Sequence, residues 1–381
     1  MKALITGCGI GGPATAMALR EVGIDAEIFE AYATQADDVG SFLNIASNGL
    51  SALRILGAHK QVMAAGIPTP RMVMWSGSGK LLGEVANGLA LDDGTVSHTI
   101  LRSDLYRIVR DEALSRNISI QYGKRLISYE DTGTQVRAHF DDGTQATGDI
   151  LISAEGVHST TRTLLAANAP KPHYTGLYSF GGITKYPSQT ATPGTYHMIF
   201  GKHAFFGHAT APTGETWWFA NLPRAEGDIP RDWKPLLVDA FKDDNGIAAD
   251  LISHSHVAAG LPVHDLPPVP TWHKGRVTLM GDAAHATSPS AGQGASLAAE
   301  DAIVLARCLR DEPDHTRAFA RFEQERRQRV ERVVSYSRRI SNSKAAGPVG
   351  RVFRDLMMPF FLKKTASQES LSWMYRHRVD L

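Results

Sequence analysis

Two glycine-rich segments, far apart in the chain, have the residue types and spacing to bind a nucleotide. The first, Gly7–Gly12, reads Gly-x-Gly-x-x-Gly between an apolar run at 2–6 and a helical pattern that has Pro13 in its first turn. Glycine lets the backbone approach a ligand closely, and a helix N-terminus attracts an anion. Glu30 ends the next strand-like run, at the distance where an acid meets ribose hydroxyls. The order of these features predicts a dinucleotide-binding βαβ unit.

The second segment, Gly281–Gly294, joins an apolar strand-like run to a helical pattern that begins at Ala295. Asp282 stands at the carboxyl end of that strand, where an acid accepts hydrogen bonds from sugar or ribityl hydroxyls. Gly292 and Gly294 leave room for a flat ligand, and the following helix N-terminus favours a ligand that becomes anionic. A structural turn with a helix cap is the alternative for this segment taken by itself.

The composition indicates a globular protein with more than one domain. The chain has 381 residues, of which 43% are hydrophobic, and this exceeds the usual size of a single core. Its 40 Lys plus Arg balance 39 Asp plus Glu, so charge gives no reason to expect nucleic acid or a membrane surface as a partner. The two cysteines are too few for a disulfide framework, which favours a cytoplasmic location. Glycines interrupt the apolar N-terminal run, so no secretion signal is expected, and no apolar run is long enough to span a membrane.

The spacing of apolar residues indicates an α/β fold. Short strands are predicted at 2–6, 26–29, 72–75, 80–84, 118–122, 125–130, 135–140, 149–153 and 277–280. Longer strands rich in aromatic residues are predicted at 178–186, 196–200, 204–210 and 217–221, and they form an inserted sheet. Helices are predicted at 14–22, 48–56, 103–114, 232–241, 247–253, 298–309 and 315–342. The expected architecture is a Rossmann-like domain with an inserted mixed β-sheet substrate domain and C-terminal helices.

Three polar features are candidates for binding a phosphate or for capping a helix. Ser76–Gly79 could be a phosphate loop, but it lacks the full spacing and lies between strand patterns, so a hairpin turn is predicted. Ser103 is a candidate N-cap for the helix that follows it. Arg102, just before that helix, either binds phosphate oxygens or pairs with a surface acid.

The C-terminal region is helical and rich in arginine. The helix predicted at 315–342 carries Arg326, Arg327, Arg329, Arg332, Arg338 and Arg339. Glutamates at 323, 325 and 331 interleave with them at helical spacing, which favours a solvated face over a nucleic-acid surface. The amphipathic tail at 352–362 and 371–375 is expected to pack across the two domains rather than attach to a membrane.

Four features of the sequence, taken in their order along the chain, resemble one family of flavoproteins. They are the Gly7–Gly12 triplet with Glu30, Arg102, the loop at 154–162, and Gly281–Gly294. This family is the group A, or para-hydroxybenzoate hydroxylase-like, FAD-dependent aromatic monooxygenases. The resemblance covers the chain from its start to about residue 340. One departure is Glu155-Gly156, where the family has Asp-Gly, and it puts in doubt the detailed handling of the pyridine nucleotide.

The resemblance implies which residues bind FAD. The cofactor-binding residues carried over are Gly9, Gly11, Gly12, Glu30, Ala31, Asn44, Arg102, Leu126, Asp282, Pro289, Gly292, Gln293, Gly294 and Ala295. Among them, the first glycines would approach the pyrophosphate and Glu30 the adenosine ribose. The backbone of Leu126 would bind the adenine, and that of residues 292–295 the isoalloxazine.

The resemblance also implies a division into domains. The FAD-binding domain would consist of three segments, at 1–72, 101–173 and 266–342. Along the chain, a substrate-domain hairpin at 73–100 and a substrate-binding sheet at 174–265 would separate these segments. A C-terminal helical segment would occupy 343–381.

The implied reaction is the hydroxylation of an aromatic, heteroaromatic or polycyclic small molecule through a flavin C4a-hydroperoxide. NADPH or NADH would act as a transient co-substrate, with O2 as the oxidant. A second Gly-x-Gly-x-x-Gly does not follow the first, which fits transient binding of the nicotinamide. An FAD-dependent reductase or oxidase and a flavin-carrying binding protein are the alternatives. The protein is expected to be a monomer or a homodimer.

The residue that acts as a base, if one does, is not identified by the sequence. His203, His208 and Tyr186 are weak candidates in or beside the strands of the inserted sheet, because a histidine can deprotonate a phenolic substrate. No metal site is predicted, since the histidines at 254 and 256 have no Cys or acid at ligand spacing. The region around residue 203 lacks an arginine that would grip a urate-like anion.

Overall fold

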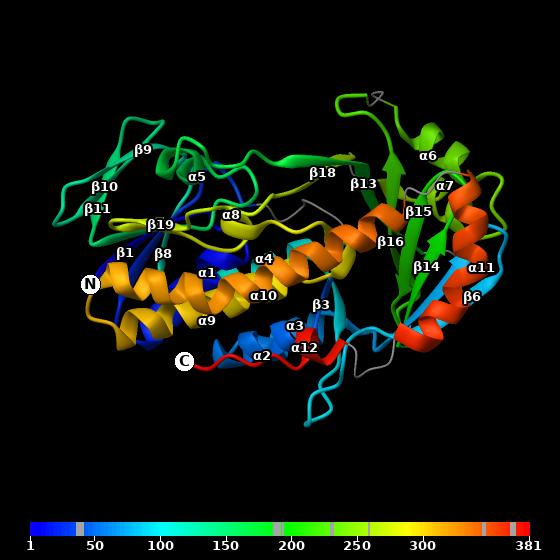
Figure 1. The fold of residues 1–381 in the computed structure, drawn as a ribbon, viewed down its shortest axis with the longest axis horizontal. Coiled ribbons are helices and arrows are strands. Elements are labelled where there is room, and N and C mark those ends of the chain that lie inside the picture. Colours follow the sequence, from blue (N-terminus) through cyan, green and yellow to red (C-terminus); the bar gives the residue numbers. More distant parts are fainter. Residues whose placement is uncertain are drawn as a thin grey trace.

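The computed structural model describes residues 1–35, 42–185, 192, 194–228, 232–257, 260–344, 348–365 and 371–381. The molecule is elongated, with the N-terminal part at one end and a large twisted sheet at the other (Figure 1). The long helix α10 (His315–Lys344) runs along the N-terminal part toward the sheet.

A six-stranded sheet organises the N-terminal part, in the order β19-β20-β12-β1-β2-β8. Its strands are β1 (Lys2–Thr6), β2 (Asp25–Phe29), β8 (Ser119–Gln121), β12 (Ile150–Ser153), β19 (His273–Lys274) and β20 (Val277–Leu279). Neighbouring strands are parallel except for β19 and β20. Residues 3–5 and 150–152 are fully buried, as expected for a parallel sheet that is covered on both faces.

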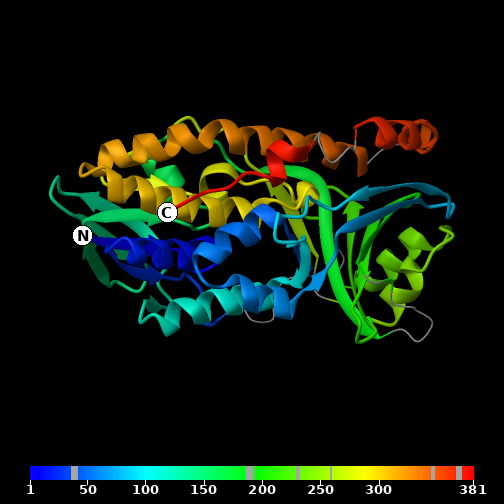
Figure 2. The same ribbon diagram turned by 90° about the horizontal axis from the view of Figure 1, so that it is seen from below.

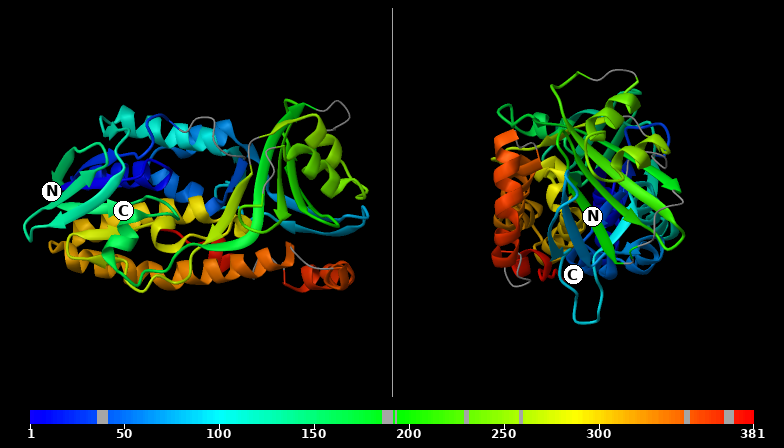
Figure 3. Two further views of the ribbon diagram at one scale, coloured as in Figure 1. Left: turned by 90° about the horizontal axis from the view of Figure 1, so that it is seen from above. Right: turned by 90° about the vertical axis from the view of Figure 1, so that its right-hand side faces the viewer.

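The helices of this part come from distant segments of the chain. They are α1 (Gly11–Glu21), α2 (Ser47–Ile55), α3 (His59–Ala65), α4 (Arg102–Ser115), α5 (Thr160–Leu165), α8 (Asp282–His285) and α9 (Gly294–Asp311). Helix α9 packs against α1, α2 and α10. Figures 2 and 3 show α9 and α10 lying side by side along the length of this part. The start of α9 is therefore enclosed by segments that precede it by some 250 residues or more in the chain.

Two three-stranded sheets complete the N-terminal part. Strands β9 (Leu126–Asp131), β10 (Val136–Phe140) and β11 (Gln145–Gly148) form an antiparallel meander. Strands β3 (Phe42–Ile45) and β4 (Ile67–Pro68) flank β7 (His98–Leu101).

The large sheet has eight strands, in the order β17-β13-β16-β15-β14-β5-β6, with β18 paired to β13. Its strands are β5 (Arg71–Ser76), β6 (Leu81–Ala86), β13 (His173–Lys185), β14 (Thr195–Phe200), β15 (Phe205–Thr210), β16 (Glu215–Pro223), β17 (His256–Val257) and β18 (Leu261–Asp265). Strands β5 and β6 form the hairpin predicted at 76–79, and β5 pairs in parallel with β14. The inserted sheet therefore includes a hairpin that lies about 100 residues earlier in the chain than its main strands.

Strand alternation gives the large sheet two apolar faces. The outer face packs on α6 (Lys234–Phe241) and α7 (Ala248–Ser253) through Phe180, Phe206 and Trp218. The inner face, on the other side, looks toward the N-terminal part (Figure 2).

We use the name inner face for nine positions of β14, β15 and β16, leaving aside Glu215 and Pro223, the end residues of β16 that share the same alternation. The nine positions are Tyr196, Met198, Phe200, Phe205, Gly207, Ala209, Trp217, Phe219 and Asn221. The ring of Phe42 in β3 lies 5.6 Å from the ring of Tyr196 and 5.7 Å from that of Phe219, between ring centroids. The inner face thus meets the N-terminal part at β3.

The C-terminal helices contact both parts, as expected for the tail. Helix α11 (Pro348–Thr365) packs on β6, and α12 (Ser372–Tyr375) contacts α2. Among the residues that the structure describes, no helix is both long and apolar enough to cross a bilayer.

The predicted boundaries hold best for long, periodic segments and fail for short ones. Helix α4 begins at Arg102, so Ser103 lies inside its first turn, and no side chain caps the helix. Ser103 as the N-cap was therefore wrong. Strands β3 and β7 and helix α8 were missed because segments of four residues are too short to show a period.

The prediction of a solvated arginine face on α10 was wrong for two of its arginines. The side chain of Arg326 is 1% exposed and that of Arg329 is 9% exposed. Both pair with buried acids of α9, Glu300 and Asp301. These acids lie on another helix, so spacing within α10 did not reveal the pairs.

Candidate functional site

The Gly7–Gly12 loop makes a tight turn between β1 and α1. Gly7 has a φ of +99°, and a Cβ there would overlap the backbone of Ala154. A Cβ on Gly12 would overlap the carbonyl oxygen of Gly7. The turn itself therefore requires these two glycines. A Cβ on Gly9, in contrast, would meet nothing within 4 Å among the residues that the structure describes, which leaves this stretch of backbone open to a ligand.

Glu30 lies beside this loop, as its spacing predicted. Its carboxylate accepts hydrogen bonds from the backbone N–H of Cys8 at 2.6 Å and of Tyr32 at 2.9 Å. The backbone N–H of Lys124 donates to the carbonyl oxygen of Glu30 at 2.7 Å, which brings the approach to Leu126 alongside. Glu30, expected to bind the ribose, and Leu126, expected to bind the adenine, thus lie at the same end of the sheet. Ala31 follows Glu30 in the chain.

The second glycine segment lies next to the first, because β12 pairs with both β1 and β20. The Thr15 hydroxyl of α1 donates to the sulfur of Met280 at 2.8 Å, and a Cβ on Gly11 would lie 3.3 Å from Met280 Cε. Gly281 has a φ of +55°, and its N–H donates to Asp301 Oδ2 at 2.9 Å. Two segments separated by some 270 residues therefore form adjacent turns at the carboxyl edge of one sheet.

Asp282 and Arg102 carry opposite charges at the starts of α8 and α4. Both side chains are exposed to solvent, although many protein atoms surround them. Burial raises the pKa of the Asp282 carboxyl, while His285 and Arg102 oppose that rise. Arg102 Nε also donates to the Tyr106 hydroxyl at 2.7 Å. An arginine and an acid in this arrangement suit a pyrophosphate and the hydroxyls next to it.

Helix α9 begins at Gly294, and no side chain caps its N-terminus. Its free N–H groups and its dipole therefore favour a ligand with negative charge at this end. Gly292 has a φ of +60°, and a Cβ there would lie 3.5 Å from Asn44 Cβ. Gln293 is fully buried, and its Nε2 has no hydrogen-bond partner in the described part of the chain. With Ala295, these residues form a backbone surface that includes an unused donor.

The turn that contains Pro289 is held by serines of α10. The hydroxyl of Ser288 lies 2.6 Å from that of Ser341 and 3.0 Å from that of Ser337. The backbone N–H of Ala291 donates to Ser337 Oγ at 3.1 Å. Pro289 itself is exposed. Helix α10 therefore fixes the turn while the proline remains accessible.

Glu155, the departure from the family pattern, turns back on its own loop. Its carboxylate accepts hydrogen bonds from the Ser159 hydroxyl at 2.8 Å and from the N–H and hydroxyl of Thr161, both at 2.9 Å. The buried Arg162 then donates to the carbonyl oxygen of Ala283 at 3.1 Å, which ties the loop to α8. An effect of Glu155 on the use of the pyridine nucleotide stays a prediction.

The weak candidates for a catalytic base are not gathered on the inner face. His208 lies on the outer face, where its ring stacks 4.7 Å from that of His197, and burial lowers its pKa to about 3. His203 is exposed in the turn between β14 and β15. Tyr186 lies outside the described residues.

Sequence reasoning missed the buried charges behind the second glycine segment. Asp301 Oδ2 accepts hydrogen bonds from the Gly281 N–H and from His285 Nε2 at 2.6 Å, and Arg326 Nε donates to Asp301 Oδ1 at 2.7 Å. One signal was present, because Glu300 and Asp301 interrupt an otherwise apolar helical run, and adjacent acids in such a run need partners.

The residues present fit one FAD molecule that spans both segments. Gly9 offers open backbone at one end, and the backbone at the start of α9 offers N–H groups without a side-chain cap at the other. Helices α1 and α9 both begin without a side-chain cap, so each has free N–H groups for a phosphate or an anionic ring.

Comparisons with known proteins agree with this arrangement. The family model described as "FAD binding domain" matches residues 1–337. The FAD-dependent urate hydroxylase of Klebsiella pneumoniae is 30% identical over 348 residues, which cover 89% of each chain. The aurachin C monooxygenase/isomerase of Stigmatella aurantiaca is 31% identical over 344 residues, which cover 89% of this chain and 88% of the relative.

Solved structures extend the similarity to the whole fold. The crystal structure of Klebsiella pneumoniae HpxO complexed with FAD and uric acid has a TM-score of 0.88 to this chain at 26% identity. The similarity covers 98% of this chain and 97% of HpxO. The predicted FAD cofactor is thereby confirmed, together with the assignment as an enzyme that uses NAD(P)H and O2. The chain belongs to the para-hydroxybenzoate hydroxylase-like family of FAD-dependent aromatic monooxygenases.

Proposed function

We propose that this monooxygenase inserts one oxygen atom from O2 into a neutral aromatic or heteroaromatic ring that binds against the inner face. The composition of that face carries the proposal. Its nine positions hold aromatic, thioether and small side chains with one amide, and none holds a carboxylate or a cationic group. Such a wall suits a flat and largely apolar ligand.

Bound FAD supplies the redox chemistry, since it accepts a hydride from NADPH or NADH and activates O2 for transfer to the substrate. The chain binds and orients this cofactor. Glu30 would hold the adenosine ribose, and Arg102 with Asp282 would hold the pyrophosphate and the ribityl hydroxyls. The backbone of residues 292–295 would support the flavin ring, and the inner face would exclude water from the reacting atoms.

Two polar groups of the inner face would orient the substrate by donating hydrogen bonds. Burial raises the pKa of the Tyr196 hydroxyl well above its ordinary value, so this group keeps its proton. Trp217 is 6% exposed, and its indole N–H has no partner among the described residues. Both groups suit a carbonyl or hydroxyl oxygen on the ring. None of the nine positions offers a cation to a urate-like anion, and Arg354 of α11, whose guanidinium carbon lies 4.7 Å from the centroid of the Phe200 ring, is paired with Asp355. We therefore propose a different substrate class from that of the urate hydroxylase.

A substrate screen tests this proposal. Purified holoenzyme would be given neutral phenols, quinones, N-heterocycles and polycyclic ketones, with urate and benzoates as anionic comparisons. We expect neutral rings to stimulate NADPH or NADH oxidation, and the product to gain one atom of label from isotopic O2. Stimulation by anions alone would contradict the proposed substrate class. Turnover of the substrate without label would favour the alternative reaction, that of a reductase or oxidase.

A further inference from the structure

Two adjacent acids of α9 stand behind the second glycine segment, Gly281–Gly294. Glu300 and Asp301 are both fully buried. Asp301 binds the start of this segment directly, through the N–H of Gly281. Glu300 reaches the end of the same segment indirectly, through Asn48 of α2 and then Gln293.

The link from Glu300 to Gln293 is a chain of two buried amides. Asn48 Nδ2 donates to Glu300 Oε1 at 2.7 Å and to Gln293 Oε1 at 3.0 Å. Asn48 is 1% exposed and Gln293 is 0% exposed, so water does not compete for these bonds. Gln293 Nε2 is left without a partner within the described residues.

The carboxylate gives this chain of amides its direction. An ionised carboxylate only accepts hydrogen bonds, so Asn48 must turn its NH2 group toward Glu300. The same NH2 group faces Gln293, which must therefore present its oxygen to Asn48. The NH2 group of Gln293 is then forced to point away from Asn48. Reversing either amide would set acceptor against acceptor, or donor against donor, in a buried place.

Two arginines of α10 keep Glu300 charged. Arg329 binds it with Nε at 2.8 Å and with a terminal nitrogen at 2.7 Å, and Arg326 lies 2.8 Å away. Burial alone would raise the pKa of Glu300, but Arg326 and Arg329 outweigh it and lower the pKa. Arg329 also donates to the carbonyl oxygens of Trp373 at 3.1 Å and Met374 at 2.9 Å.

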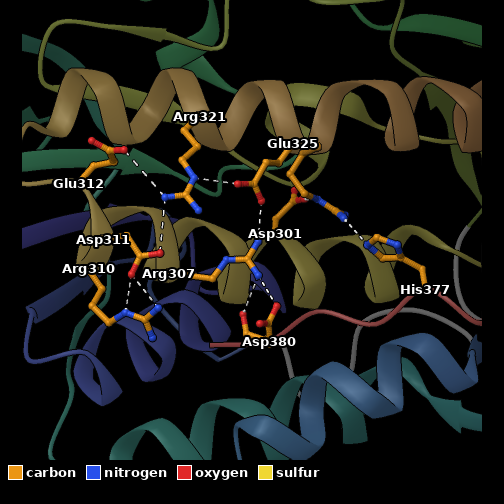
Figure 4. Close-up of polar contacts among 10 residues, drawn as sticks. Asp301, Arg307, Arg310, Asp311, Glu312, Arg321, Glu325, His377 and Asp380 are labelled. Atoms are coloured by element: carbon orange, nitrogen blue, oxygen red, sulfur yellow. Dashed lines mark hydrogen bonds and ion pairs between the residues drawn. The ribbon is translucent and has the colours of Figure 1, made fainter.

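These arginines belong to a charged seam between α9, α10 and the C-terminal segment. Figure 4 shows Asp301 and His377 in this seam, with Arg307 between Glu325 and Asp380. The C-terminal segment thus contributes Asp380 and His377 to the seam, where they contact Arg307 and Arg326.

We propose that Glu300 is a positioning residue for the flavin, which fixes the buried Gln293 side chain through Asn48 and so holds the backbone of residues 292–295 against the isoalloxazine. This inference rests on the proposed position of the flavin ring at residues 292–295. It extends the binding site to a carboxylate that touches neither the cofactor nor either glycine turn.

Coupling between Glu300 and Gln293 tests the inference. The variants are Glu300→Gln, Gln293→Met and the double variant, each stripped of cofactor and titrated with FAD without substrate. Flavin fluorescence gives the dissociation constant, and the visible spectrum reports the surroundings of the ring. We expect each single variant to weaken FAD binding roughly fivefold to tenfold, the value of one hydrogen bond. The double variant should bind no more weakly than Gln293→Met and should show the same altered spectrum.

Glu325→Gln is the matched control. Glu325 pairs with Arg307 and Arg321 on the same two helices, and no amide side chain joins it to Gln293. Its loss should leave the FAD spectrum and the dissociation constant unchanged.

The other outcomes separate the possible failures. Additive effects of Glu300→Gln and Gln293→Met would overturn the positioning role. An unchanged dissociation constant and spectrum in Gln293→Met would overturn the position of the flavin ring and this inference with it, whereas the substrate screen tests the reaction separately. If Glu300→Gln does not fold, Asn48→Leu breaks the chain of amides without changing a charge, and the same coupling criterion decides.

Discussion

At the scale of single residues, the glycines of the first loop do different things. Gly7 and Gly12 are required by the turn, because a Cβ at either position would overlap the backbone of another residue. Gly9 is free of such a neighbour, so its lack of a side chain serves a ligand. In the sequence motif these three glycines look equivalent. Only the folded turn shows that two of them are needed for the backbone and one leaves room for a ligand.

Gly9→Ala and Gly12→Ala should therefore fail in different ways. Gly9→Ala should leave the thermal melting of the cofactor-free protein nearly unchanged, because the added methyl meets no protein atom, and should weaken FAD binding at least tenfold. Gly12→Ala should lower the melting temperature of the cofactor-free protein, because the backbone must shift. Equal FAD affinity in Gly9→Ala and the parent protein would show that this stretch does not contact the cofactor.

Trp217→Phe tests the proposed substrate contact on the inner face. It keeps an aromatic ring but removes the indole N–H that has no partner among the described residues. We expect KM for the substrate to rise roughly fivefold to tenfold, the value of one hydrogen bond, with little change in FAD affinity. Trp218→Phe is the comparison on the outer face, since its N–H donates to Ser255 instead. A rise in KM only in Trp218→Phe would contradict the proposed substrate wall.

At the scale of elements, the large sheet carries a pH dependence through His208. The pKa of this buried ring falls from 6.5 to about 3, because burial disfavours its charged form and His197 adds to the effect. A lowered histidine pKa means that the unfolded chain binds the proton more readily. The free energy of unfolding is therefore highest, as far as His208 is concerned, above about pH 6.5, and it decreases as the pH falls from there toward 3. At pH 5 the loss is about 2 kcal/mol.

His208→Phe should remove this part of the acid sensitivity. Denaturant unfolding of the variant at pH 7 and pH 5 should show a smaller loss of stability than the parent protein shows. The exposed His203 serves as the control, and His203→Phe should keep the parent slope. Parallel slopes in all three proteins would mean that His208 is not the group that titrates.

The packing of α10 on α9 depends on buried charge rather than on an apolar stripe alone. Arg326 is 1% exposed and pairs with Glu300 and Asp301, which are equally buried. Arg326→Met would leave both acids in a buried site with less compensation, and such a loss costs about 3 to 5 kcal/mol. Arg321→Met, on the exposed side of α10, should change stability little. Similar unfolding free energies for the two variants would contradict this role of the buried pair.

At the scale of the whole molecule, local patterns predicted the elements that lie close together in the chain. The strand, glycine turn, helix and acid at 2–30 were read correctly, because each contact in them spans few residues. The alternation of the inserted strands likewise revealed an aromatic sheet. The family resemblance then joined the two glycine segments into one site.

Contacts that arise only after folding could not be predicted in this way. Glu300, Asn48 and Gln293 come from two helices separated by about 250 residues, and the arginines that keep Glu300 charged come from a third. The period of α10 places Arg326 on the apolar stripe, four residues from both Phe322 and Val330, but it does not show which acids pair with it. The short strand β3, which brings Asn44 to Gly292, is likewise held by its pairing with β7 and not by its own four residues.

The most direct test of this account is a crystal structure of the protein with FAD bound. We expect one FAD with its pyrophosphate at Gly9, its ribose at Glu30 and its isoalloxazine against residues 292–295, in front of the inner face. The Gln293 side chain should keep its hydrogen bond to Asn48 in this complex. An FAD whose ring lies away from residues 292–295, or whose pyrophosphate does not meet the first loop, would contradict the central claim.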